Sequence, residues 1–188
     1  MGKIKSVLLS IQPKWCELIA SGKKTIEIRK TRPKIKTPFK CYIYCTKQNV
    51  PGEILLTYNK KVVGRNKGFR DNGDIPLAGK VIGEFICDCI LSHCEMANAD
   101  IAEQQGCIKR EKLFEYANDE ELYGWHISDL IIYDEPKLVD DFYNADKCPY
   151  ESKAGCTYKY YCYRAGQAKK CKGTLTKPPK NWCYVEKN

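Results

Sequence analysis

Apolar and polar positions in the first quarter of the chain predict a strand, a helix and two further strands. Residues 5–12 are an apolar run typical of a buried strand. Pro13 then occupies a favourable first position for a helix, and Gly22 is a natural stop for it. Residues 25–30 alternate with the period of two that a strand requires, and residues 40–46 predict another strand.

The remaining pattern predicts one long strand, a helical segment and two final strands. Residues 79–91 are apolar on both faces of the expected strand, which indicates that both faces are covered. Residues 95–121 are predicted to be helical, with a break near Gln105-Gly106. Residues 122–133 and 182–186 predict the last two strands.

This order of elements predicts an α+β fold, a small mixed β-barrel with one or two helices at its mouth. A chain of 188 residues has the size of one domain, so we expect residues 1–188 to form a single unit. Three insertions are expected within it: a loop or hairpin at 47–78, the helical segment at 95–121 and a cysteine-rich segment at 147–173.

The charge distribution points to a polyanion. The net charge is +9, and 43% hydrophobic residues exclude wholesale disorder. Residues 1–70 carry 17 Lys and Arg against 3 acids, residues 71–146 carry 5 against 18, and residues 147–188 carry 10 against 2. If the two basic blocks meet in space, they form a positive field suited to nucleic acid. The alternative is a surface that neutralises itself internally.

The hydropathy profile argues against a membrane protein. No apolar run approaches the roughly 20 residues that a membrane span needs, and the opening apolar run at 7–11 is too short for a signal peptide. We therefore expect a soluble, cytoplasmic protein without membrane contact. The sequence does not determine the oligomeric state, and a monomer is favoured.

Four of the twelve cysteines predict a structural zinc site. With no export signal, the cysteines are expected as thiols, buried hydrophobes or metal ligands rather than disulfides. The segment 147–173 is poor in aliphatic residues, so a tetrahedral zinc would supply folding free energy that burial cannot. The spacing of the first three cysteines resembles that of CCCH zinc fingers, whose fourth ligand is a histidine; no histidine follows here, so Cys171 would serve instead. The alternative is four free thiols in a loop. The four cysteines follow the pattern C-x7-C-x5-C-x8-C: Cys148, Cys156, Cys162 and Cys171.

Four other cysteines alternate within predicted strands. This spacing predicts that they face the core as small hydrophobic side chains. They are Cys41, Cys45, Cys87 and Cys89.

Three charged residues fall on one predicted turn and strand. Lys24 lies at the turn, and Glu27 and Arg29 share one face of the next strand with Thr25. A cation, a carboxylate and a guanidinium so close together could hold the edge of a base together with a phosphate. The alternative is a solvated strand face with a Glu-Arg ion pair.

The same residues resemble a known family. Gly22-Lys23-Lys24-Thr25-Ile26-Glu27-Ile28-Arg29 fits the pattern G-x-K-x-x-E-x-R, which is similar to the signature of ASCH domains, and Ser10-Ile11-Gln12-Pro13 precedes it. Segments 124–130 and 178–186 resemble bacterial and phage members. The resemblance implies a PUA-like barrel whose polar strand face lies in a pocket for RNA or a modified nucleoside.

Further ligand-binding candidates follow from position. Ser10 and Gln12 end the first predicted strand, beside the expected pocket. Trp125 and His126 are neighbours on a predicted strand, so only one of them can point inward, where it would offer a stacking ring or a polar group. The pattern does not decide which.

Two classes of function are consistent with the sequence. The first is a binding module, in which the pocket captures a base and the Tyr- and Lys-rich segment 147–173 grips a single strand, unless its tyrosines only pack the zinc module. The second is a hydrolase, because the resemblance includes amidohydrolases of acetylated cytidine and ribonucleases.

The hydrolase alternative assigns roles to the same residues. In such amidohydrolases a Lys, a Thr and a distant Glu act; Lys24 matches the first, whereas Glu27 stands in place of the Thr. As an enzyme, the chain would use Lys24 to activate water, Glu27 as general base and Arg29 to hold the substrate. The departure at Glu27 favours binding over catalysis.

Overall fold

The computed structural model describes residues 5–47, 77–92, 100–144 and 175–187, together with the backbone of two strands at 54–58 and 61–66. The four cysteines predicted to bind zinc lie outside the described residues, as does the whole of segment 147–173. Within the described ranges, no helix has the length and apolar character that crossing a membrane requires.

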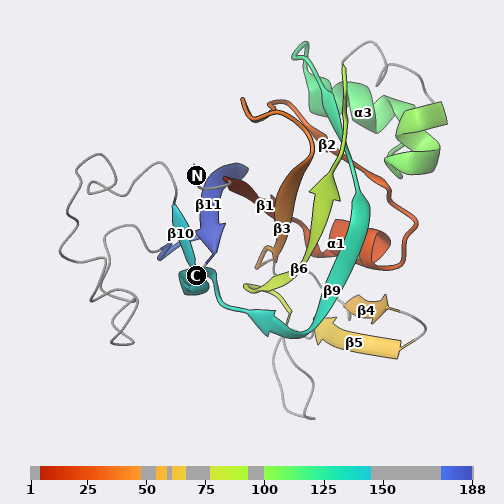
Figure 1. Cartoon of the computed structure of the whole chain (residues 1–188). Helices are drawn as coiled ribbons and strands as arrows, with labels where there is room; N and C mark the ends of the chain where they lie inside the picture. The colour runs from red at the N-terminus through yellow and green to blue at the C-terminus, as the bar shows by residue number, and fades with distance from the viewer. Residues whose placement is uncertain are drawn as a thin grey trace, which may run out of the picture.

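A six-stranded sheet forms the body of the molecule, in the order β10-β11-β1-β3-β6-β9 (Figure 1). Strands β1 and β3 pair in parallel, and the other neighbours pair antiparallel. The strands are β1 (Ser6–Ile11), β3 (Phe39–Cys45), β6 (Val81–Cys87), β9 (Ser128–Lys137), β10 (Phe142–Asn144) and β11 (Trp182–Lys187).

The parallel pairing of β1 and β3 requires a crossover, because the chain must return to the same end of the sheet. Helix α1 (Pro13–Ala20) provides it, and β2 (Ile26–Arg29) follows within the same connection. As predicted, Pro13 occupies the first turn of α1, where its missing N–H costs nothing. The helix buries Cys16 and Ile19 against the sheet.

A second, three-stranded sheet has the order β2-β8-β7, with β7 at Ile90–Leu91 and β8 at Tyr123–His126. Two chain segments pass from one sheet to the other. Strand β6 leads into β7 across Asp88 and Cys89, and β8 leads into β9 across Ile127.

These two passages correct the sequence prediction. The α+β class and the mixed sheet are confirmed, but the six-stranded sheet is curved and is not closed into a barrel. The predicted long strand 79–91 is broken at Asp88, so β9 is the longest described strand. The reason is that β7 and β8 leave the main sheet to pair with each other, and β8 pairs with β2.

The segment predicted to be helical packs on β2. It contains a π-helix η1 (Ile101–Gln105) and helix α3 (Arg110–Ala117), with the break after Gln105 where the sequence predicts one. Its apolar side chains form a small core with Ile26 and Ile28: Ala102, Leu113 and Ala117. This packing fixes one face of β2 and leaves the other face to the polar residues.

Two further short elements complete the described chain. Strands β4 (Ile54–Tyr58) and β5 (Lys61–Asn66) pair antiparallel where the sequence predicts a hairpin, and β4 lies beside α1. A 3-10 helix η2 (Val139–Asp141) connects β9, which ends at Lys137, to β10.

Trp125 lies at the centre of the main core. Its side chain is fully buried, and its ring meets Phe39 and Trp182 edge to face at centroid distances of 5.8 and 6.0 Å. Three of the four cysteines predicted to face the core are buried there: Cys41, Cys45 and Cys87. The prediction is wrong for Cys89, which is exposed because the strand breaks at that point.

Candidate functional site

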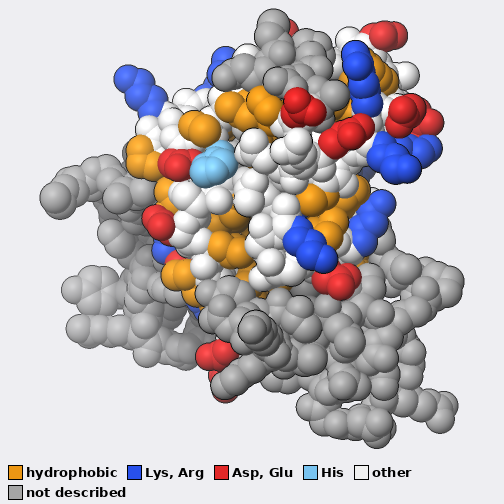
Figure 2. Space-filling view, turned by 90° about the vertical axis from the view of Figure 1, so that its right-hand side faces the viewer, with side chains coloured by type: hydrophobic (Ala, Val, Ile, Leu, Met, Phe, Trp, Pro, Cys, Tyr) orange, Lys and Arg blue, Asp and Glu red, His pale blue; other side chains and the backbone are white. Residues whose placement is uncertain are grey.

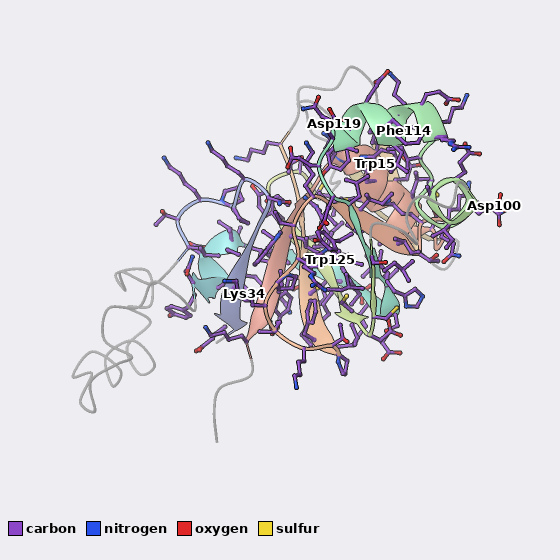
Figure 3. All side chains as sticks on the ribbon, turned by 90° about the horizontal axis from the view of Figure 1, so that it is seen from above. Trp15, Lys34, Asp100, Phe114, Asp119 and Trp125 are labelled. Atoms are coloured by element: carbon purple, nitrogen blue, oxygen red, sulfur yellow. The ribbon has the colours of Figure 1, made fainter. Side chains whose placement is uncertain are left out.

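A cavity of about 730 Å³ opens between α1, β2 and the helical segment 100–117. The ends of β1 and β3 close it from the side of the main sheet, and Lys180 closes it from the C-terminal segment. Seen from above, Trp15 of α1 lies on the same side of the molecule as Phe114 of α3, with Trp125 nearer the middle of the sheet (Figure 3). The lining includes Ser10, Gln12, Lys14, Trp15, Lys24, Glu27, Arg29, Thr46, Lys47, Cys107, Lys109, Lys112, Tyr116 and Lys180.

The turn after α1 delivers Lys24 to the floor of this cavity. Gly22 adopts φ +74°, a conformation that glycine tolerates without strain, and the Lys24 N–H then donates to the Leu18 carbonyl at 2.9 Å. The Lys24 Nζ donates to the Gly106 carbonyl at 2.6 Å and lies 5.0 Å from the centre of the Trp15 ring. The signature lysine is therefore held from both sides of the cavity.

Gly106 has to be small for this contact to form. A Cβ atom there would lie 2.6 Å from the Ala102 carbonyl oxygen and 2.8 Å from Ile28 Cδ1. The absence of a side chain lets the helical segment approach β2 closely enough for its carbonyl to meet Lys24.

Glu27 is a buried carboxylate between two cations. Its Oε1 lies 2.9 Å from Arg29 Nη2, and its Oε2 lies 3.6 Å from Lys24 Nζ. The Glu27 side chain is only 7% exposed, so the alternative of a solvated strand face is wrong. Burial lowers the pKa of Lys24 from its ordinary value, and the Glu27 carboxylate opposes this shift by stabilising the ammonium form.

Arg29 connects the second sheet to β1 and to the segment just before β11. Its Nη2 donates to the Ser10 carbonyl at 2.8 Å, and its Nη1 donates to Asn181 Oδ1 at 2.6 Å. Two buried polar atoms of the cavity lining, Arg29 Nε and Thr46 Oγ1, have no hydrogen-bond partner among the described residues. Buried polar atoms in proteins are usually paired, so these two are exceptions among the described residues.

The charge around the cavity is strongly positive. Seven basic side chains line it against one carboxylate, that of Glu27. The first basic block supplies Lys14, Lys24, Arg29 and Lys47, and the last supplies Lys180. Blocks distant in sequence thus meet at this cavity. Lys109 and Lys112 also line the cavity, although they belong to the middle block of the chain. The net negative charge of that block gave no indication of their contribution.

The structure brings together most, but not all, of the predicted ligand-binding residues. Ser10, Gln12, Lys24, Glu27 and Arg29 line the cavity, whereas Thr25 is absent from its lining. The Ser10 hydroxyl is engaged, since it donates to the Pro179 carbonyl at 2.6 Å.

Neither Trp125 nor His126 lies at the cavity, so the expectation that one of them faces it is corrected. Trp125 points into the core, and His126 lies on the outer surface, where its Nδ1 is 2.6 Å from Asp88 Oδ1. Strand β8 pairs antiparallel with β2, so Trp125 stands opposite Glu27 in the register. The Trp125 ring nevertheless packs into the main hydrophobic core and does not reach the cavity.

Sequence reasoning missed several residues of the site. Trp15 and Tyr116 supply the aromatic surface, and Asn181 holds Arg29. Asn181 lies inside segment 178–186, so the resemblance of that segment to a known family could have indicated it. Nothing in the sequence around Tyr116 indicates a role at a site, because the pattern of that segment predicts only a helix that packs on the sheet.

Comparison with known proteins identifies relatives by family and by fold. A family model described as the ASCH domain matches residues 9–163. The crystal structure of ASCH from Zymomonas mobilis is 18% identical and covers 72% of this chain and 75% of that chain, with a TM-score of 0.49. A variant of the same protein is 17% identical and covers 99% and 92%, with a TM-score of 0.54, and this likeness concerns the fold alone. No curated protein matches the chain.

Proposed function

The chain belongs to the ASCH domain family, whose PUA-like fold is associated with RNA binding, and from this premise we propose that its cavity binds a base of RNA or a modified nucleoside. The observation that carries the proposal is the buried Lys24-Glu27-Arg29 group, set in a cavity that is otherwise lined by cations.

The size and walls of the cavity suit a nucleoside. Sites for small ligands usually enclose about 300–1,000 Å³, and this cavity measures about 730 Å³. Trp15 and Tyr116 offer aromatic faces on which a base could stack. The Glu27 carboxylate, which lines the cavity, could accept hydrogen bonds from the N–H groups of a base.

The rim suits the phosphates of a polynucleotide. Five exposed lysines surround the buried group, and single-stranded RNA binds such surfaces through phosphate contacts that release counterions. They are Lys14, Lys47, Lys109, Lys112 and Lys180. A ligand that places a base in the cavity would carry its backbone across these side chains.

Replacing Lys24 with Met tests the proposal. The variant keeps the aliphatic stem but removes the ammonium, so binding of a nucleoside or short RNA should weaken by about 1.5–3 kcal/mol, or roughly 10- to 100-fold. Trp15 lies in the cavity wall while Trp125 is buried in the core, so quenching of tryptophan fluorescence on titration measures the affinity.

Lys36→Met is the matched control. Lys36 is exposed and is absent from the cavity lining, so its loss should leave the affinity unchanged. Equal affinities for the parent and Lys24→Met, with both proteins folded, would contradict the proposal.

A hydrolase of the same ligand class is the second candidate function. The observation in its favour is the buried Lys24, whose pKa burial lowers, beside a carboxylate that could orient a water molecule. The same panel of nucleosides and RNA decides the matter: turnover that disappears in Lys24→Met supports the hydrolase, and binding without turnover supports the binding module.

We also propose that Cys148, Cys156, Cys162 and Cys171 hold one structural zinc, as their spacing predicts. Purified protein should then retain about one zinc per chain after dialysis, and Cys156→Ser or Cys162→Ser should release it. Elemental analysis measures the metal, and limited proteolysis should show new cleavage within 148–171 while the sheets stay protected. Zinc-free parent protein whose 148–171 segment resists protease would count against this site.

A further inference from the structure

A second group of chemically reactive side chains lies outside the cavity, at the corner where the chain passes between the two sheets. Asp88 and Cys89 form the connection from β6 to β7, and His126 ends β8 beside them. One ligand atom from each of the three residues lies within 4.8 Å of the other two. None of the three lines the cavity, so they take no part in the proposed nucleoside site.

Backbone pairing holds the three side chains together. The backbone N–H of His126 donates to the Cys89 carbonyl at 3.1 Å. The next residue, Ile90, begins β7 and pairs antiparallel with β8 opposite Trp125. The His126 Nδ1 lies 2.6 Å from Asp88 Oδ1, and the Cys87 thiol donates to the Cys89 carbonyl at 3.3 Å. The ligand atoms therefore meet where a two-residue connection is held against the end of β8.

The group is accessible from solution. The side chains of His126 and Asp88 are 36% and 45% exposed, and Cys89 is exposed as well. Figure 2 shows the one described histidine, in pale blue, at the surface next to an acidic side chain. An ion could reach these ligands without any movement of the core.

We propose that Asp88, Cys89 and His126 form a surface site for a divalent transition metal ion of the zinc type. A thiolate, an imidazole and a carboxylate are the ligands that zinc takes in proteins, whereas magnesium and calcium take oxygen alone. Three protein ligands at a surface leave the fourth tetrahedral position open to water or an external ligand. Binding replaces the Asp88–His126 hydrogen bond with two bonds to the ion, one from each residue. The neutral imidazole then carries its proton on the ring nitrogen that does not bind, and the Cys89 thiol releases its proton to solvent.

Ligand bonds of about 2.0–2.3 Å place the ligand atoms of a tetrahedral site roughly 3.5 Å apart. The separations in this group are within 4.8 Å, so rotations of the exposed side chains are sufficient to close the site. The bound ion would clip the β6–β7 connection to the end of β8, at the corner that the two sheets share.

The imidazole signals of His126 provide a specific readout, because the chain has two histidines and a His93→Gln variant assigns them. Full-length protein, with the zinc it retains on purification, is titrated with additional zinc or with magnesium while the imidazole nitrogens are followed by NMR. Zinc should shift the His126 signals to saturation, and magnesium should not.

Cys89→Ser and Asp88→Asn should each weaken this zinc binding by at least about tenfold, since even supporting residues of metal sites cost 10- to 100-fold. The matched control is Cys183→Ser, which removes a half-buried thiol in β11, outside both the metal group and the cavity lining, and should titrate like the parent. The proposal is overturned if zinc leaves the His126 signals unmoved, or if Cys89→Ser binds zinc as tightly as the parent and Cys183→Ser do.

Discussion

Replacing Glu27 with Gln should lower the free energy of unfolding by about 3–5 kcal/mol, the usual loss when one partner of a buried ion pair is removed. The carboxylate is 7% exposed and lies 2.9 Å from Arg29 and 3.6 Å from Lys24. Without it, two cations whose side chains are only 4% and 10% exposed lie close together with no counter-charge. Urea denaturation, followed by circular dichroism, measures the loss.

Glu120→Gln is the matched control for this stability change. It makes the same chemical substitution in a Lys-Glu pair, with Lys30 at 2.6 Å, but the Glu120 side chain is 58% exposed. Exposed pairs contribute little because water screens them, so the expected loss is below about 1 kcal/mol. Losses of equal size in Glu27→Gln and Glu120→Gln would show that the buried group has no special role in the fold.

The double variant Lys24→Met/Glu27→Gln separates the two cations. If the destabilisation in Glu27→Gln arises partly from an uncompensated Lys24, removing that ammonium should recover part of the lost stability. The sum of the losses in the two single variants should then exceed the loss in the double variant. Strictly additive losses would assign the whole effect to Arg29. In either case the result bears on the site, because these side chains define the floor of the cavity.

Neutralising three rim lysines, Lys47, Lys109 and Lys180, should weaken RNA binding and make it less dependent on salt. Each phosphate contact to a single strand contributes about 0.7 to the slope of log affinity against log salt concentration, so Lys-to-Gln changes at all three positions should lower that slope by about 2. All three side chains are exposed and line the cavity. Fluorescence anisotropy of a labelled single-stranded RNA, repeated over a range of salt concentrations, measures the slope.

A triple variant of equal charge change provides the control. Arg32, Lys34 and Lys36 are exposed residues of the connector before β3 and are absent from the cavity lining; Figure 3 shows Lys34 well away from Trp15. Changing them to Gln should alter the slope much less than the rim variant does. An equal effect of the two triple variants would indicate binding that follows net charge alone, with no preference for the cavity.

The sequence by itself determined the local elements and the chemistry of the buried group. The alternation over 25–30 placed Glu27 and Arg29 on one strand face, and the signature beginning at Gly22 brought Lys24 beside them. Proline at the start of α1 and the break after Gln105 were also readable. Such features depend on neighbours within a few residues, so periodicity and turn chemistry are sufficient to predict them.

Only the tertiary structure decided what each face meets. Period-two alternation predicts that Trp125 and His126 point in opposite directions. It does not predict that Trp125 packs into the core while His126 lies at the outer surface. Likewise, the pairing of β2 with β8, the hydrogen bond from Lys24 to the Gly106 carbonyl and the hydrogen bond from Arg29 to Asn181 join segments 82 or more residues apart. Contacts of this kind depend on how distant segments of the chain pack against one another. The local pattern of apolar and polar residues does not specify that packing, so it cannot predict these contacts.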